Sequence, residues 1–239
     1  MTQQKLALIT GGSKGLGKTL AGWLVHQGYD LILTARTADT LTATASELET
    51  ADASIHTLVG DVSDEAHQQA IADVVANYGQ LDLLFNNAST LGTLPMPSLT
   101  DYDVDALAHV FHVNVIAPIT LTQKLLPYLS DGLVVNLSSD AAVGGYAGWG
   151  AYGASKAALD LISKTLANEL HAQNVAVISV DPGDMRTDMH QDAFPNDDIS
   201  DRPLPDVTLP FWGWLLGQDR MAISGQRFSA QAEVWEVTS

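Results

Sequence analysis

Short apolar runs alternate along the chain with segments of helical spacing, and this alternation restricts the fold more than any other feature. The apolar runs are short enough for buried strands and lie at 5–10, 30–35, 54–60, 81–86, 132–139 and 174–180. Segments with helical periodicity separate them, among them 16–28, 64–79 and 121–129. Continuously apolar strands that alternate with helices are typical of a parallel sheet covered on both faces. We therefore predict a single doubly wound α/β domain over 1–239, with a mostly parallel sheet.

Composition narrows the class of protein and of partner. The chain has 239 residues, 46% of them hydrophobic, which suits a sizeable core. With 28 acidic and 11 basic residues its formal net charge is −17, so its surface repels nucleic-acid phosphates and anionic lipid. The absence of cysteine excludes disulfides, thiolate catalysis and Cys-ligated zinc. The strongly apolar segment 209–216 is shorter than the roughly 20 residues of a membrane span. We predict a cytoplasmic protein that binds neither nucleic acid nor membrane and has no metal site.

A glycine-rich turn, TGGSKGLG at 10–17, directly follows the first apolar run. Gly11, Gly15 and Gly17 would permit a tight turn and let backbone amides approach a pyrophosphate at the start of the next helix. The spacing G-x-x-x-G-x-G differs from the common G-x-G-x-x-G fingerprint, and glycine turns also occur for structural reasons alone. The position between a strand and a helix, at the start of the alternation, favours a dinucleotide site in a Rossmann-type domain.

The end of the second apolar run indicates which dinucleotide binds. A carboxylate about 20 residues beyond the glycines would bind the ribose hydroxyls of NAD(H), whereas an arginine suits the 2′-phosphate of NADP(H). The run is followed by Arg36, no acid lies between Asp30 and Asp39, and Lys14 stands inside the glycine turn. These two basic residues predict NADP(H) rather than NAD(H). The alternative is that Arg36 is an ordinary surface residue after a strand.

Tyr152 and Lys156 lie four residues apart in AYGASKAALD (151–160), so in a helix they share one face. Reduction of a carbonyl needs a proton for the developing alkoxide, and a tyrosine with the ordinary pKa of about 10 supplies it slowly at neutral pH. A lysine ammonium one turn away favours the phenolate and is expected to lower that pKa. Taken alone, the pair would more often be an exposed helix face without a catalytic role.

Four motifs in this order carry a family resemblance: TGGSKGLG (10–17), NNAS (86–89), NLSS (136–139) and YGASK (152–156). Over essentially the first 190 residues the sequence resembles the short-chain dehydrogenase/reductase family. The resemblance implies a nicotinamide-dependent oxidoreductase with a Rossmann-type core, assembled as a homotetramer or homodimer. The sequence departs from the family at Ser89, where glycine is frequent, and we expect this to alter loop packing but not chemistry. The C-terminal segment 224–239 lacks the paired glycines that often close these proteins.

The resemblance also assigns roles to single residues. Tyr152 matches the proton donor and Lys156 the lysine of the family; Ser139, thirteen residues before the tyrosine, matches the catalytic serine in preference to Ser138. Asn114 in HVNVIAP matches the active-site asparagine, and Asn86 and Ala88 match the turn beside the adenosine ribose. The cofactor-binding residues expected from the glycine turn and the resemblance together are Gly11, Ser13, Lys14, Gly15, Leu16, Gly17, Arg36, Asp61, Val62, Asn87, Ala88, Tyr152, Lys156, Pro182, Gly183, Met185 and Thr187.

Asn114 permits a further inference from backbone chemistry. Pro118 has no N–H, so if 114–118 is helical the carbonyl of Asn114 lacks its usual donor and is free to bind a water that connects outward to Lys156. The alternative is an ordinary proline kink with Asn114 as a buried polar residue.

Together these features predict an NADPH-dependent oxidoreductase that reversibly reduces a ketone, aldehyde or 3-oxo compound, with a small-molecule carbonyl or alcohol as substrate. Two alternatives stay open. One is a non-catalytic NADP(H)-binding redox sensor, which would not need the Ser139, Tyr152 and Lys156 set. The other is an NAD-linked sugar or sterol alcohol dehydrogenase, which Arg36 disfavours.

The substrate side is less determined by the sequence. Candidate pocket residues are Leu91, Leu94, the segment 144–150 and Phe194, and the residues that could make the pocket aromatic or belong to the plain core are Tyr146, Trp149, Trp212 and Trp214. The segment 184–205 is rich in aspartate and is expected to be a long substrate-side loop. Because it follows the expected nicotinamide segment, we predict a lid that orders only when the site is occupied, with Met189 and Phe194 covering an apolar substrate.

Overall fold

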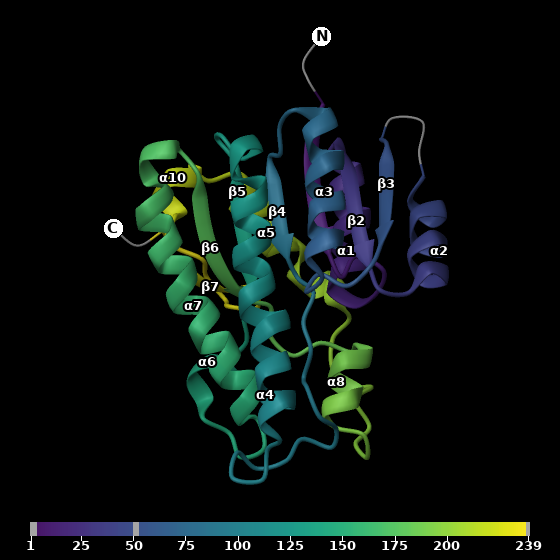
Figure 1. The fold of residues 1–239 in the computed structure, drawn as a ribbon, viewed down its shortest axis with the longest axis vertical. Coiled ribbons are helices and arrows are strands. Elements are labelled where there is room, and N and C mark those ends of the chain that lie inside the picture. Colours follow the sequence, from purple (N-terminus) through teal and green to yellow (C-terminus); the bar gives the residue numbers. More distant parts are fainter. Residues whose placement is uncertain (1–3, 50–52, 238–239) are drawn as a thin grey trace.

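A seven-stranded parallel sheet forms the centre of the computed structural model, which describes residues 4–49 and 53–237 (Figure 1). The strands lie in the order β3-β2-β1-β4-β5-β6-β7, and every pairing is parallel. Their bounds are β1 Lys5–Thr10, β2 Tyr29–Ala35, β3 Ile55–Val59, β4 Leu83–Asn86, β5 Leu133–Leu137, β6 Ala176–Asp181 and β7 Arg227–Ser229. The predicted doubly wound parallel sheet is confirmed, and the six apolar runs form β1 to β6.

Helices cover both faces of the sheet. One face is covered by α1 (Gly15–His26), α2 (Ala38–Leu48) and α9 (Leu209–Leu216), and the other by α3 (Glu65–Tyr78), α5 (Ala117–Leu125) and α7 (Gly150–Leu170). The shorter helices are α4 (Val104–Phe111), α6 (Ala141–Gly144), α8 (Asp188–Ala193) and α10 (Arg220–Ile223), and short 3₁₀ turns are η2 (Leu126–Tyr128), η3 (His171–Gln173) and η4 (Pro205–Thr208).

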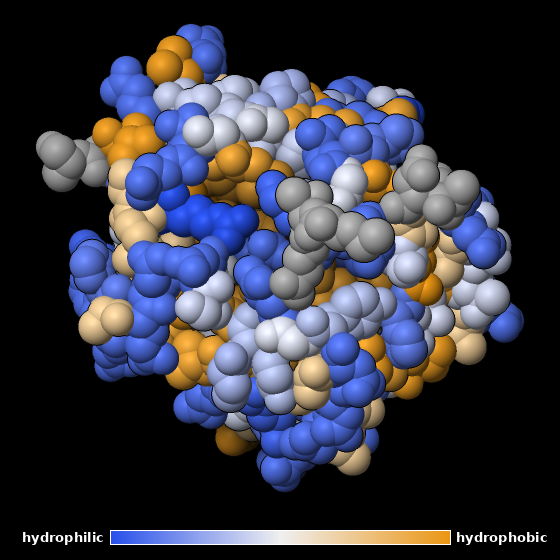
Figure 2. All heavy atoms as spheres, turned by 90° about the horizontal axis from the view of Figure 1, so that it is seen from above, coloured by the Kyte–Doolittle hydropathy of each residue, from blue (hydrophilic) through white to orange (hydrophobic). Residues whose placement is uncertain are grey.

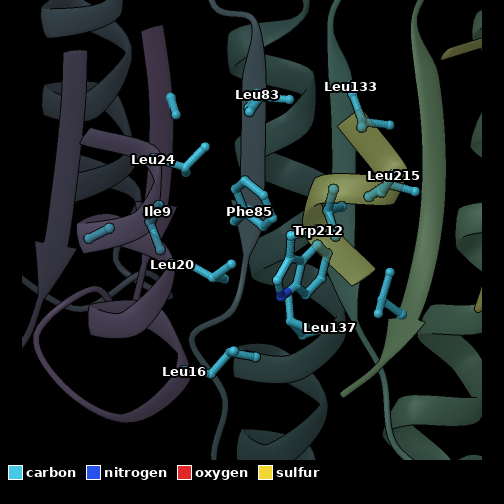
Figure 3. Close-up of a cluster of buried hydrophobic side chains, with 14 of the residues drawn as sticks. Ile9, Leu16, Leu20, Leu24, Leu83, Phe85, Leu133, Leu137, Trp212 and Leu215 are labelled. Atoms are coloured by element: carbon cyan, nitrogen blue, oxygen red, sulfur yellow. The ribbon is translucent and has the colours of Figure 1, made fainter. Parts of the chain in front are cut away.

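Alternate residues of each strand enter different cores because successive side chains of a strand point to opposite faces. In β1, Ala7 and Ile9 join the core under α1 and α9, whereas Leu6 and Leu8 join the core under α3, α5 and α7. The first core is centred on Trp212, whose ring meets Phe85 edge to face at 5.6 Å (Figure 3). Trp212 is fully buried there, so it is a core residue and not a pocket wall.

Residues 104–128 form the one candidate membrane span among the described residues, because helical structure runs from α4 through a wider π-helical turn, η1 (His112–Ile116), to α5 and η2. By length and composition alone this stretch could cross a membrane, although the sequence analysis singled out only the shorter segment 209–216. The stretch packs on the sheet, with Leu121 and Leu125 in the core. It is therefore an amphipathic cover of the sheet, of the kind that core helices of soluble proteins also provide.

Two segments differ from the sequence expectation. The segment 184–205 is not a loop throughout, because α8 lies inside it and is capped by Thr187, whose hydroxyl accepts a hydrogen bond from the His190 N–H. Near the C-terminus, β7 was not predicted and pairs with β6 as the last strand of the sheet.

The chain leaves β1 in one direction to β2 and reaches β4 on the other side, so the topological switch point lies between β1 and β4. Parallel sheets of this kind bind ligands at the carboxyl ends of the strands beside that point. The strands run downward in Figure 1, so their carboxyl ends face the lower half of the view, where α8 lies. Figure 2 shows the opposite end, where hydrophilic side chains cover much of the surface between smaller apolar areas.

Candidate active site

A cavity of about 290 Å³ lies at the carboxyl ends of β1, β2, β4 and β5, at the switch point. It extends from the glycine turn to Tyr152 and to the start of α8. The expected cofactor residues that line it are Gly11, Ser13, Lys14, Gly15, Leu16, Arg36, Asp61, Val62, Asn87, Ala88, Tyr152, Lys156, Pro182, Met185 and Thr187. The fold thus brings into one cavity predicted cofactor-binding residues that are more than 170 positions apart in the chain.

The glycine turn shapes one end of the cavity. Gly11 and Gly15 have φ values of +66° and +53°, a conformation that other residues rarely adopt. A Cβ on Gly11 would lie 2.9 Å from the Asn87 amide nitrogen, and one on Gly15 would lie 3.4 Å from the Thr187 methyl. Because α1 begins at Gly15, its free N–H groups lie at the cavity, and side chains here would fill the space. The turn therefore fits a pyrophosphate.

Five expected site residues are absent from the cavity wall: Ser139 and Asn114, which are described below, and Gly17, Gly183 and Asn86, which have structural roles. A Cβ on Gly17 would lie 2.2 Å from the Gly11 carbonyl oxygen, so Gly17 is needed for the close packing of α1 on the turn. Gly183 has φ +74° and donates its N–H to Asp181 at 3.0 Å, which shapes the turn after β6. Asn86 is buried and donates to the Asn136 side chain at 2.8 Å, so it joins β4 to β5.

Lys14 and Arg36 both line the cavity near the glycine turn, as the sequence predicts for a phosphate site. Arg36 is exposed, and Lys14 forms an ion pair of 2.8 Å with Asp188 of α8. Both side chains of this pair are largely exposed, so the pair contributes little to stability and a phosphate can compete for Lys14.

Asp61 lies on the same wall at the end of β3. Burial tends to raise the pKa of Asp61, but hydrogen bonds from the Ser63 side chain and backbone, with Arg36 nearby, hold the pKa below its ordinary value. The carboxylate is therefore charged at neutral pH and accepts hydrogen bonds.

Thr10, the last residue of β1, positions the turn after β4. Its hydroxyl accepts the N–H groups of Asn87 and Ala88, both at 3.0 Å, and donates to the Phe85 carbonyl at 3.2 Å. Sequence reasoning missed this residue. The available signal was a hydroxyl at the end of an otherwise apolar strand, at the edge where parallel strands place their ligands.

Tyr152 and Lys156 lie in the first two turns of α7 and both are buried. The Lys156 ammonium lies 5.5 Å from the centre of the Tyr152 ring and donates to the Leu137 carbonyl at 2.7 Å. Burial raises the pKa of Tyr152 well above its ordinary value, and burial lowers the pKa of Lys156 to about 8, against a raising effect from Asp160. The expectation that Lys156 lowers the pKa of Tyr152 is therefore not met in this structure, because burial is the largest effect on both groups.

Two serines, Ser139 and Ser89, lie beside the Tyr152 hydroxyl, and hydrogen bonding to each acts to lower the tyrosine pKa. Ser139 also donates to Asp140 at 3.0 Å and accepts the Ala141 N–H at 3.1 Å. The Ser138 hydroxyl is buried without a hydrogen-bond partner. Ser89 reaches both Tyr152 and the Asn114 side chain, so its contacts extend beyond the loop, and the expectation that it leaves the chemistry unaltered stays a prediction.

Asn114 lies inside the π-helical turn η1, where the Ala117 N–H bonds back to His112 across one residue more than in an α-helix. Its side-chain oxygen accepts from Ser89 and the Thr90 N–H, and its amide donates to the Thr90 carbonyl and Ser155 at 2.9 and 3.0 Å. The side chain thus ties the loop after β4 to α7. The role of its carbonyl toward a water stays a prediction.

Aromatic and apolar side chains surround the far side of Tyr152. The Trp149 ring lies edge to face on Tyr152 at 5.8 Å and contacts Phe194 at 5.7 Å. Leu91, Met96 and Ala193 pack in the same cluster. Of the other candidates, Leu94 and Tyr146 are exposed, and Trp214 packs against Phe211 in the core under α9. The residues Met189 and Asp188 line the cavity from α8.

Comparison with known proteins decides the family. The model of the short chain dehydrogenase family matches residues 5–198. The chain belongs to the short-chain dehydrogenase family. As a member it is an oxidoreductase with a Rossmann-type fold, and the resemblance seen in the four sequence motifs is confirmed.

Related short-chain dehydrogenases agree with this membership. An uncharacterized oxidoreductase of Escherichia coli K12, YciK, is 34% identical over 97% of this chain and 93% of its own length. The serine 3-dehydrogenase of Agrobacterium fabrum is 37% identical over 76% of this chain and 72% of its own length. A short chain dehydrogenase of Escherichia coli CFT073, solved in complex with NADPH, is 32% identical with a TM-score of 0.84 and covers 95% of this chain and 97% of its own.

Proposed function

We propose that the protein is an NADP(H)-dependent reductase of carbonyl compounds that also works in reverse as an alcohol dehydrogenase. The observation that carries the proposal is a single cavity with Arg36 and the glycine turn at one end and Tyr152 with Lys156 at the other. The NADPH complex of the Escherichia coli relative supports the choice of cofactor.

Different residues of the cavity would bind different parts of the cofactor. The glycine turn and the start of α1 would hold the pyrophosphate, and Arg36 with Lys14 would hold the 2′-phosphate. Asp61 and Val62 would contact the adenine, and Asn87 and Ala88 the adenosine ribose. The residues that would hold the nicotinamide end are Tyr152, Lys156, Pro182, Met185 and Thr187.

The chain's own contribution to the reaction is proton transfer and orientation. The bound cofactor supplies a hydride to the carbonyl carbon. Ser139 hydrogen-bonds the substrate oxygen, and Tyr152 donates the proton that the developing alkoxide needs. Because burial raises its pKa, Tyr152 is fully protonated at neutral pH and available as a donor. The phenolate that remains is stabilised by the Lys156 ammonium beside its ring, so the lysine acts mainly when charge develops.

The surroundings of Tyr152 favour an uncharged substrate with an apolar or aromatic substituent. Trp149, Phe194 and Met96 lie next to the tyrosine, in an apolar cluster. The charges of Asp181 and Asp140 both act on Tyr152, and Arg227 forms an ion pair with Asp181 but not with Asp140. An anionic substituent would therefore meet repulsion. This setting also disfavours polar substrates such as those named for the serine 3-dehydrogenase and L-xylulose reductase relatives.

A charge-matched substrate series tests both parts of the proposal. Acetophenone, its para-carboxylate and its para-trimethylammonium derivative share one skeleton and differ in charge. We expect NADPH-dependent reduction of the neutral and cationic ketones, and kcat/KM at least about tenfold lower for the carboxylate, the factor that 1.4 kcal/mol represents. The Asp140→Asn variant should narrow that gap, whereas Asp73→Asn on the outer helix α3 should not. Equal turnover of the carboxylate would contradict the substrate class, and no turnover of any carbonyl would contradict the reductase.

The alternative of a non-catalytic NADP(H) sensor makes a different prediction, since it would bind NADPH and turn over no carbonyl. The close approach of Ser139, Ser89 and Lys156 to the Tyr152 ring favours catalysis. The expected homodimer or homotetramer and the cytoplasmic location stay predictions.

A further inference from the structure

Arg227, the first residue of β7, makes three hydrogen bonds with one guanidinium group. Its Nε donates to the Asp160 carboxylate at 2.9 Å, and its Nη2 donates to the Ser139 carbonyl at 2.9 Å and to the Asp181 carboxylate at 3.3 Å. The two carboxylates are 17% and 11% exposed, so this is a partly buried cluster and not a surface ion pair. Removing one partner of such a cluster is costly, because it leaves a partly buried charge uncompensated.

The three acceptors belong to the three segments that carry the chemistry. Ser139 follows β5 and lies beside the Tyr152 hydroxyl. Asp160 lies on α7, one turn beyond Lys156. Asp181 ends β6, and its second oxygen accepts the Gly183 N–H in the turn that leads to the expected nicotinamide segment. The guanidinium is therefore the one group among the described residues that is hydrogen-bonded to all three segments.

We propose that Arg227 is a positioning residue that holds the serine loop, the Tyr152 helix and the nicotinamide turn in one register. The planar, forked guanidinium matches these three acceptors, whereas a lysine ammonium could reach them only as a point charge. The proposal rests on the proposed reductase function only where activity is the readout.

The charge of Arg227 should also affect the pKa of Lys156. The carboxylate of Asp160 raises the pKa of Lys156, which burial otherwise lowers to about 8. Arg227 neutralises that carboxylate, so loss of the arginine should strengthen the pull of Asp160 on the lysine proton. Loss of Asp160 should do the opposite. The two variants therefore act on Lys156 in opposite directions.

Steady-state kinetics of Arg227→Met against Lys164→Met provide the first test. Lys164 is an exposed lysine of α7 beside the same surface groove, so its replacement removes the same charge without removing a hydrogen bond to Ser139, Asp160 or Asp181. We expect kcat to fall roughly 10- to 100-fold in Arg227→Met, because small displacements of reacting groups are costly, with the KM for NADPH changed much less. Lys164→Met should stay within about twofold. Arg227→Lys should recover part of the loss.

Chemical rescue separates lost positioning from general damage. The Arg227 side chain is 32% exposed and lines the groove, so a small cation can enter the space that alanine leaves. Millimolar guanidinium chloride should restore activity to Arg227→Ala, whereas sodium chloride or urea at the same concentration should not.

The pH profile gives a readout that a merely structural role would not move. The alkaline limb of kcat, assigned to Lys156, should shift to higher pH in Arg227→Met and to lower pH in Asp160→Asn. Shifts of the two limbs in the same direction would contradict the charge coupling.

Amide hydrogen exchange tests the positioning without any substrate. Exchange at residues 182–187 should be faster in Arg227→Met than in Lys164→Met, because the Asp181 to Gly183 bond loses its support. Equal exchange together with equal kcat in the two variants would overturn the proposal. If Arg227→Met does not fold, Arg227→Lys and Asp160→Asn carry the same exchange and pH tests. If the wild type reduced no carbonyl, the exchange result would still decide the role of Arg227.

Discussion

The two ends of the cavity are built in different ways. At the phosphate end, Gly11, Gly15 and the start of α1 shape the wall within a few consecutive residues, and Thr10 joins this turn to β4 through short hydrogen bonds. At the substrate end, the wall is formed by rings that meet across the chain, as in the contact of Trp149 with Phe194 at 5.7 Å. Backbone conformation determines the first end, and side-chain packing determines the second.

This difference has consequences for stability and for variation. A wall made of backbone turns beside buried strands is expected to open only with the sheet, whereas a wall made of rings at helix ends, Trp149 before α7 and Phe194 after α8, is expected to open by local motion. Under the proposed function, we expect substrates to exchange at the substrate end and the cofactor to be held at the phosphate end. Tyr152 and Lys156 lie where the two ends meet.

The largest expected effect is at that junction. Tyr152→Phe keeps the ring and its contact with Trp149 but has no proton to give, so turnover should fall by about 10²- to 10⁴-fold. Binding of NADPH, measured by its fluorescence, should persist, because the phosphate end is unchanged. Turnover within a few-fold of the wild type would show that Tyr152 is not the proton donor.

The lowered pKa of Lys156 should make the stability of the protein depend on pH. Its folded pKa of about 8 lies below the ordinary value of 10.5, so the unfolded state binds more protons between these values and the native state gains stability as pH rises through them. Relative to Lys156→Met, the free energy of unfolding of the wild type should therefore increase from pH 8 to pH 10.5 by about 3 kcal/mol at most. Denaturant unfolding at several pH values measures this. If the difference in unfolding free energy between the wild type and Lys156→Met stayed constant with pH, burial would not lower the pKa of Lys156.

Arg36 tests the phosphate end by itself. Arg36→Asp should lower the ratio of NADPH to NADH kcat/KM by about tenfold or more, because a charged hydrogen bond to phosphate contributes about 1.5–3 kcal/mol and the carboxylate repels it. The ratio of NADPH to NADH kcat/KM for the neutral variant Arg36→Gln should lie between those of the wild type and Arg36→Asp. A wild type that uses NADH as well as NADPH would refute the charge argument, while the substrate end would be unaffected.

The smallest effect is expected at the substrate end. Phe194→Ala should raise the KM for an aromatic ketone about two- to tenfold, the size of one ring contact, and leave the KM for NADPH unchanged. The lid prediction belongs to the same region: amides of residues 188–200 should exchange more slowly with NADPH and a substrate analogue than without. Equal protection in both states would leave the helix α8 as a permanent wall and not a lid.

Most of the fold could be predicted from local sequence patterns. Apolar runs marked β1 to β6, the glycine turn placed the cofactor end, and the spacing of Tyr152 and Lys156 placed them on one helical face. Each of these signals is contained in fewer than about ten neighbouring residues. Most residues predicted from such signals line one cavity. Gly17 and Gly183 do not, because a glycine that permits close packing looks the same in the sequence as one that faces a ligand. Asn86, Asn114 and Ser139 also lie outside the cavity wall.

The sequence by itself determined where β1 to β6 lie along the chain, the glycine turn and the placing of Tyr152 and Lys156 on one helical face, because these depend on local periodicity and backbone freedom. The tertiary structure decided what depends on burial and on distant partners. It placed Trp212 in the core, brought Ser89 to the Tyr152 hydroxyl and joined Arg227 to Ser139, Asp160 and Asp181. It also reversed the expected direction of the tyrosine pKa, since the desolvation of a side chain is a property of everything packed around it.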